Sequence, residues 1–255
     1  MTIQAGRSDL ISVDQVAVVV TLGGMPHHAG LIFRNKEKTL CVLHLANHKR
    51  LRSESYPGMR PSGESFCWIA AVLDLPPATS RTLVGILRKV AKREPYISPH
   101  ISYGVKVLEA HGSFSINGDY TTPKKSNGLT CATFVTEVVG SIGYRVLKED
   151  TWPEGVNQAW IAAVVRMLRH EGADDDHIRD VENCVNARRI CPAEVIVGGD
   201  TSFRMWPLTH EQVTPLVPTV DLALTEYCGL PGGGNVPAAA AGPASPSGQV
   251  AAGLG

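Results

Sequence analysis

Apolar residues gather in short runs along the first part of the chain, and these runs predict β-strands. Residues 16–22 form a run rich in valine, which is typical of a buried strand. Residues 27–34 and 39–46 are two further apolar runs, on either side of the charged residues 35–38. Because a short polar segment joins two such runs, this stretch predicts an antiparallel hairpin.

Three other segments carry weaker patterns. Residues 52–65 are polar and contain proline and glycine, so they predict a loop. Residues 66–75 fit a helix or a strand, and residues 101–116 predict extended chain.

Helical periodicity is found mainly in the later part of the chain. Residues 77–94 predict a helix with Pro77 near its start and basic residues at its end. Apolar residues at i, i+3 and i+4 predict further helices from Cys131, over 155–170 and over 177–190. Strands that come early and helices that come late indicate an α+β fold, with an antiparallel sheet packed against helices.

The hairpin predicted over residues 27–46 brings two histidines together. If the chain turns at Lys36, opposed residues have numbers that sum to about 72, so His28 lies opposite His44. Opposed side chains in an antiparallel pair have Cβ atoms about 4.5–5.5 Å apart. The other face of the hairpin, which includes Leu31, is apolar and is expected to pack on the core.

Cys131 begins an apolar helix, and Thr130 before it is a suitable N-cap. A helix N-terminus and a nearby imidazolium both lower the pKa of a thiol, which makes it a better nucleophile. We therefore expect Cys131 to be a nucleophile, His28 its base and His44 the residue that orients His28. The alternative for Cys131 is a small core side chain on a buried helix face. His27, which precedes the pair, is given no catalytic role.

Composition narrows the classes of function. The 255 residues include 24 basic and 24 acidic side chains and only 6% aromatic residues, which does not favour nucleic-acid binding. No segment resembles a secretory signal or is apolar over transmembrane length, so we expect no stable membrane insertion and a cytoplasmic location. The six cysteines are widely spaced, without C-x-x-C pairs or zinc spacing with histidine, which predicts free thiols and no metal or other cofactor.

The C-terminal composition sets the domain boundary. Residues 228–255 are almost all Gly, Ala, Pro and Ser, which predicts a disordered tail. Residues 1–227 are then expected to form one domain with a C-terminal helical extension. The acidic run 174–176 is interpreted as a solvated loop between helices rather than a cation site.

Two of these segments resemble the motifs of a known family. The hairpin HHAGLIF…VLHL, followed later by TCATFV, resembles the permuted papain-like group of the NlpC/P60 superfamily. Lecithin:retinol acyltransferase-like members of that group carry an HWxIYVG…VIHL hairpin and then an NCEHFV helix start. His28 and His44 match the two histidines, Cys131 matches the cysteine, and the order His, His, Cys is the permuted order. The resemblance covers residues 16–145.

The resemblance implies a circularly permuted papain-like fold and a cysteine-dependent hydrolase or acyltransferase. Its substrate would be a peptide, an amide or an acyl ester, and a Cys-His-His triad would form a thioester acyl-enzyme. Ala29 replaces the family's aromatic residue and Thr133 replaces a histidine, so a catalytically inactive scaffold or binding module is the alternative. A Cys131 sulfur within about 4 Å of a His28 ring nitrogen would favour the enzyme.

Overall fold

The structure is a computed structural model that describes most of the chain. The described residues are 4–5, 11–22, 27–55, 67–92, 101–105, 112–122, 128–155, 158–184 and 187–228. The predicted tail lies outside these residues, apart from Cys228, at which the last helix ends.

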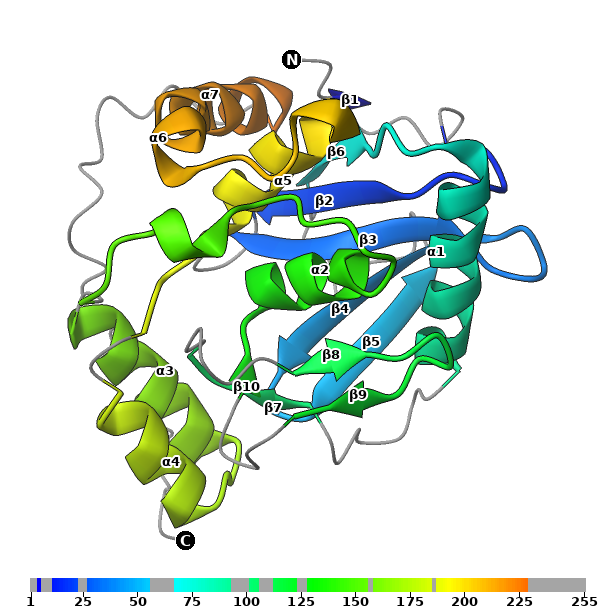
Figure 1. The fold of residues 1–255 in the computed structure, drawn as a ribbon. Coiled ribbons are helices and arrows are strands. Elements are labelled where there is room, and N and C mark those ends of the chain that lie inside the picture. Colours follow the sequence, from blue (N-terminus) through cyan, green and yellow to red (C-terminus); the bar gives the residue numbers. More distant parts are fainter. Residues whose placement is uncertain are drawn as a thin grey trace, which may run out of the picture.

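A six-stranded antiparallel sheet lies at the centre, with strand order β1-β6-β2-β3-β4-β5 (Figure 1). Its strands are β1 (Gln4–Ala5), β2 (Ala17–Leu22), β3 (His28–Arg34), β4 (Leu40–Asn47), β5 (Arg50–Ser55) and β6 (Cys67–Val72). Two smaller sheets pair β7 (Ser102–Tyr103) with β10 (Gly128–Leu129) and β8 (Ser113–Phe114) with β9 (Tyr120–Thr121). The strands predicted over 16–22, 27–34 and 39–46 are confirmed. The loop predicted over 52–65 is wrong where it overlaps β5.

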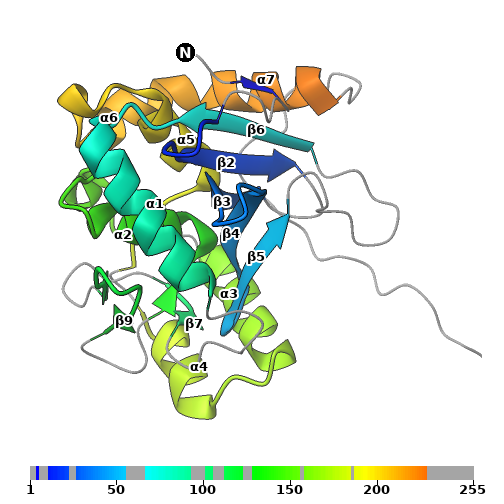
Figure 2. The same cartoon turned by 90° about the vertical axis from the view of Figure 1, so that its right-hand side faces the viewer.

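The helices are α1 (Pro77–Ala91), α2 (Cys131–Gly140), α3 (Gln158–His170), α4 (Asp175–Glu182), α5 (Pro192–Asp200), α6 (His210–Val213) and α7 (Val217–Cys228), which makes the fold α+β as predicted. Helices α1, α2, α5 and α7 pack on the sheet, whereas α3 and α4 pack on each other in a separate apolar cluster. Figure 2 shows α1 and α2 on one side of the strands, and α5 and α7 contact β2 and β6. Among the described residues, no helix combines the length and the apolar character needed to cross a membrane.

Alternation along β3 and β4 builds two apolar layers. The face turned to the helices carries Leu31, Phe33 and Leu43, all fully buried in the main core. The opposite face carries Ile32 and Val42, which belong to a second, smaller cluster. The predicted apolar face of the hairpin is therefore confirmed.

The predicted register of the hairpin is wrong by two residues. Leu31 pairs with Leu43 and Phe33 with Cys41, so paired numbers sum to 74 rather than 72. The turn extends one residue further because Lys38 adopts a left-handed conformation (φ 63°), and Asn35 N–H donates to the Thr39 carbonyl over 2.9 Å. A shift of two residues keeps every side chain on its own face, because the side-chain period of a strand is two.

Capping contacts determine where α2 and α4 begin. Thr130 caps α2: its hydroxyl accepts from Thr133 N–H at 3.1 Å, and the Thr133 hydroxyl accepts from Thr130 N–H at 2.8 Å. The position at which the resembled family has histidine thus serves here as a buried capping residue. Asp174 caps α4 by accepting from His177 N–H at 2.9 Å, so the loop predicted over 174–176 is instead the start of a helix.

Candidate functional site

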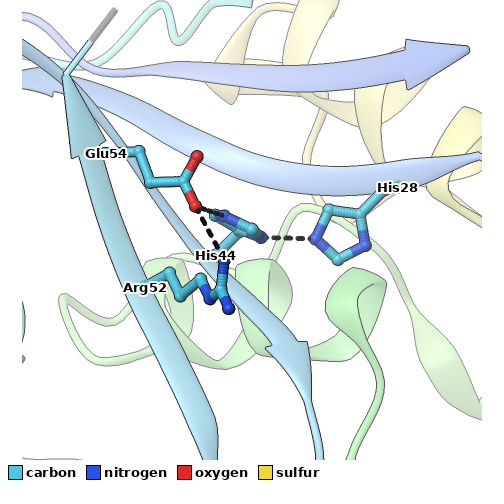
Figure 3. A network of polar contacts seen from close by, with 4 residues as sticks. All are labelled: His28, His44, Arg52 and Glu54. Carbon is cyan, nitrogen blue, oxygen red and sulfur yellow. Dashed lines mark hydrogen bonds and ion pairs between the residues drawn. The ribbon is translucent and has the colours of Figure 1, made fainter. Parts of the chain in front are cut away.

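Two histidines meet at the start of β3. His28 Nε2 lies 2.6 Å from His44 Nδ1, and the two rings are edge to face at 83° (Figure 3). His28 is not directly opposite His44, because the register places Gly30 beside His44: a Cβ on Gly30 would lie 3.1 Å from His44 Cβ. Glycine at this position leaves room next to His44, and His28 reaches it diagonally. The prediction that the two histidines lie together is confirmed, although the assumed register is wrong.

A carboxylate extends this pair on its far side. Glu54 Oε1 lies 3.6 Å from His44 Nε2, which is within ion-pair range but longer than a full hydrogen bond. The same oxygen lies 3.5 Å from Arg52 Nη1 (Figure 3). His44 lowers the pKa of the Glu54 carboxyl, which is therefore ionised at neutral pH. Arg52 pairs with His44 across β4 and β5. Both residues were missed because polar residues 52–55 predicted a loop.

The chain of contacts determines where the ring protons lie. A carboxylate only accepts, so His44 Nε2 carries the proton that faces Glu54 and its Nδ1 is an acceptor. His28 Nε2 must then donate to His44 Nδ1. In neutral His28 the remaining nitrogen, Nδ1, therefore has a free lone pair, which is what a general base requires.

His28 is neutral at physiological pH. Burial, and then His44, lower its pKa to about 3 against the opposing effect of Glu54. The ring therefore stays a base throughout the neutral range.

Cys131 is the first residue of α2, and its side chain is buried next to β3. Backbone N–H groups of Ala29 and Ala132 and the hydroxyl of Tyr103 hydrogen-bond the thiol, and each lowers its pKa. Ala29 directly follows His28, so the sulfur lies against the strand that carries the histidine. Within the described residues, however, no hydrogen bond joins the Cys131 sulfur to the His28 ring.

The expected lowering of the Cys131 pKa is wrong. Burial is the largest influence and raises the pKa of the thiol above its usual value, more than the N–H and hydroxyl donors lower it. The resting pair at neutral pH is therefore a thiol and a neutral imidazole, not a thiolate and an imidazolium.

Tyr103 is a site residue that the sequence pattern did not reveal. It pairs with Leu129 in the parallel β7–β10 ladder, and Leu129 lies two residues before Cys131 in the chain. The two strands approach closely at glycines, since a Cβ on Gly128 would lie only 2.5 Å from Gly104 N. Burial, and then Cys131, raise the pKa of the Tyr103 phenol, so it keeps its proton and can donate to the sulfur.

The neighbouring histidines have other contacts. His27 Nε2 lies 3.5 Å from Asp221 Oδ1 on α7. His48 packs against His177 of α4 with ring centroids 5.2 Å apart. Neither is part of the His28–His44–Glu54 chain.

No protein-family model, no curated protein and no solved structure matches this chain.

Proposed function

We propose that this protein is a cysteine-dependent hydrolase or acyltransferase that acts on an amide or ester bond of a peptide or acyl-ester substrate. The observations that carry the proposal are the oriented His28–His44–Glu54 chain and the Cys131 thiol at a helix start, which is hydrogen-bonded by the backbone of Ala29, the residue after His28. Such an arrangement supplies a nucleophile, a base with a free lone pair and a group that orients the base.

We also propose that the fold is a circularly permuted papain-like one. Its support is the order of the parts: two histidines on adjacent antiparallel strands come first, and a cysteine at the N-terminus of a helix packed on that sheet follows. The resemblance of the hairpin and helix-start motifs points the same way.

In the first step, the Cys131 sulfur attacks the carbonyl carbon while His28 Nδ1 takes the thiol proton. The C–S bond forms, and negative charge moves to the carbonyl oxygen. Backbone N–H groups at the start of α2 and the Tyr103 hydroxyl are the available donors near this charge. Because the resting pair is neutral, the proton moves during the attack. Catalytic contacts of this kind often shorten only when substrate is bound.

In the second step, the tetrahedral intermediate collapses and the C–O or C–N bond breaks. His28 returns its proton to the leaving alcohol or amine, which leaves a thioester on Cys131. Water or another acceptor then gives its proton to His28 Nδ1 and attacks the thioester carbonyl; the C–S bond breaks, and His28 returns the proton to the Cys131 sulfur. His44 and Glu54 keep the ring of His28 in one tautomer throughout.

A non-catalytic scaffold or binding module is the second candidate. The observation that favours it is the buried Cys131 thiol without a hydrogen bond to His28. Against it, the groups around the sulfur include N–H and hydroxyl donors, whereas a purely structural cysteine needs only aliphatic neighbours.

Trapping of the acyl-enzyme separates the two candidates. The protein is mixed with p-nitrophenyl esters and p-nitroanilides of increasing acyl length, quenched in acid and digested for mass spectrometry. We expect an acyl adduct on the Cys131 peptide that neutral hydroxylamine removes, as it does thioesters. Cys131→Ala should abolish the adduct, and Cys184→Ala, which removes a half-buried thiol of the α4 end, should not. Failure of every ester and anilide to acylate Cys131 would favour the scaffold.

The rate of acylation should be nearly flat from about pH 5 to about pH 8. His28 takes up a proton only near its lowered pKa of about 3, and the Cys131 pKa is raised, so neither group titrates in that range. His44→Ala removes a group that lowers the His28 pKa, so the acid limb should move to higher pH. Stopped-flow release of nitrophenolate measures both profiles. A bell-shaped pH dependence of the wild-type acylation rate, with its maximum near neutrality, would instead indicate a thiolate–imidazolium pair.

A further inference from the structure

We infer that His177 of α4 is a positioning residue for the Cys131 site: it holds the backbone of Tyr103 and so links the α3–α4 hairpin to the reaction. This inference depends on the proposed function, because Tyr103 matters only if Cys131 reacts. It also gives a role to helices that lie outside the segment resembling a known family.

The contact itself is a short, buried hydrogen bond. His177 Nε2 lies 2.8 Å from the Tyr103 carbonyl oxygen, and the His177 side chain is only 3% exposed. A carbonyl only accepts, so the ring proton is on Nε2. His177 Nδ1 is buried and has no hydrogen-bond partner in the part of the chain that the structure describes. The ring therefore has one strong contact, and that contact is to Tyr103.

The position of His177 is determined by the start of its helix. Its backbone N–H donates to the Asp174 side chain that caps α4. A Cβ on Gly104 would lie 3.5 Å from His177 Cε1, so the ring packs directly on the residue after Tyr103. Movement of α4 would therefore move the Tyr103 carbonyl.

His48 approaches the same carbonyl from the sheet. It lies in the β4–β5 turn, it is 6% exposed, and its ring is tilted against that of His177. Burial is the largest influence on the His48 pKa and lowers it, and His177 and Lys49 lower it further. The Tyr103 carbonyl and Asp174 act in the opposite direction and raise it. Both rings therefore lie near the Tyr103 carbonyl, and the hydrogen bond that holds it comes from His177.

Little else in the described residues holds this strand. β7 contains two residues and pairs with β10, where Gly104 N–H donates to the Leu129 carbonyl over 3.2 Å. The Tyr103 side chain packs on the main core and also on a separate apolar cluster between α3 and α4, which includes Leu168 and Ile178. Loss of the His177 bond should therefore displace the phenol that donates to Cys131.

The experiment compares Tyr103→Phe, His177→Phe, His177→Gln and the double variant Tyr103→Phe/His177→Phe. We measure acylation of Cys131 by p-nitrophenyl acetate from pH 5 to pH 10. Tyr103→Phe and His177→Phe should each slow acylation roughly tenfold at neutral pH and move the alkaline limb upward, because a donor to the sulfur is lost. The double variant should be no slower than the slower single variant. His177→Gln keeps an N–H donor and should stay within about threefold of wild type.

A merely structural His177 would change stability without these effects. His170→Phe, the same substitution at the exposed end of α3, is the control and should behave as wild type. If folded His177→Phe reacts like wild type, or its effect adds fully to that of Tyr103→Phe, the positioning role is refuted and the proposed function stands. If wild-type Cys131 is not acylated, the proposed function fails and this inference fails with it. His177→Met, also without a donor, replaces His177→Phe if the latter does not fold.

Discussion

His28→Ala is expected to slow acylation of Cys131 by about 10²–10⁴-fold while the chain stays folded. General bases contribute rate factors of this size. The factor should lie toward the upper end here, because the Cys131 pKa is raised and little thiolate exists at neutral pH to react without a base. Burst kinetics with a p-nitrophenyl ester, read together with the acyl mass on the Cys131 peptide, measure the rate.

His27→Ala is the matched control for this experiment. It removes the adjacent, partly buried histidine, whose contact is with Asp221 rather than His44. It should acylate at the wild-type rate. Added imidazole should restore part of the rate in His28→Ala, since a free base can enter the space left by the ring. A rate for His28→Ala within threefold of wild type would show that His28 is not the base.

The parts of the site that could be predicted from sequence are those that depend on local periodicity. Alternation along residues 27–46 predicted that His28 and His44 share one face, and a shift of two residues in register does not alter this. The capping preference of Thr130 predicted the start of α2 at Cys131. The exact register could not be predicted, because it depends on the left-handed conformation of Lys38.

The missed residues are held by contacts with no local pattern. Arg52 and Glu54 lie on an edge strand whose polar composition predicts a loop, although their spacing of two would place them on one face of a strand. Tyr103 comes to Cys131 through a parallel ladder of two-residue strands, which has no periodicity to detect. The Cys131 pKa shows a further limit: a helix start is visible in the sequence, whereas the burial that outweighs it is a tertiary property.

Helix α5 was not predicted for a related reason. Its residues Ala193–Gly199 are all buried, so it has no polar face and no amphipathic pattern. Its glycines also disfavour a helix by propensity. They are used for close packing: a Cβ on Gly199 would lie 2.9 Å from Val18 Cγ2, and one on Gly198 would lie 2.9 Å from Val146 Cγ1.

The second large effect is expected in acid, where His48 should make the fold less stable. In the folded state burial, then His177, lower the His48 pKa from 6.5 to about 4. Between these values the unfolded chain binds a proton that the folded chain does not, so stability falls as pH falls and the loss is complete below about pH 4. At about 1.4 kcal/mol per pH unit, this shift corresponds to at most about 3 kcal/mol, and solvent screening around the ring reduces the His48 share of the loss below that.

His48→Phe should remove this contribution and make the acid side of the stability curve less steep. Among the described residues, neither ring nitrogen of His48 has a hydrogen-bond partner, so phenylalanine replaces the ring without breaking a bond. The free energy of unfolding is measured by urea titration at intervals from pH 7 to pH 4, with His170→Phe as the exposed control. Some loss should remain in His48→Phe, because His28 also has a lowered pKa. If the free energy of unfolding of His48→Phe falls with pH as steeply as that of wild type, His48 takes up its proton in the folded protein as readily as in the unfolded chain. The interface between α4 and the β4–β5 turn would then contain a buried charge rather than a neutral pair.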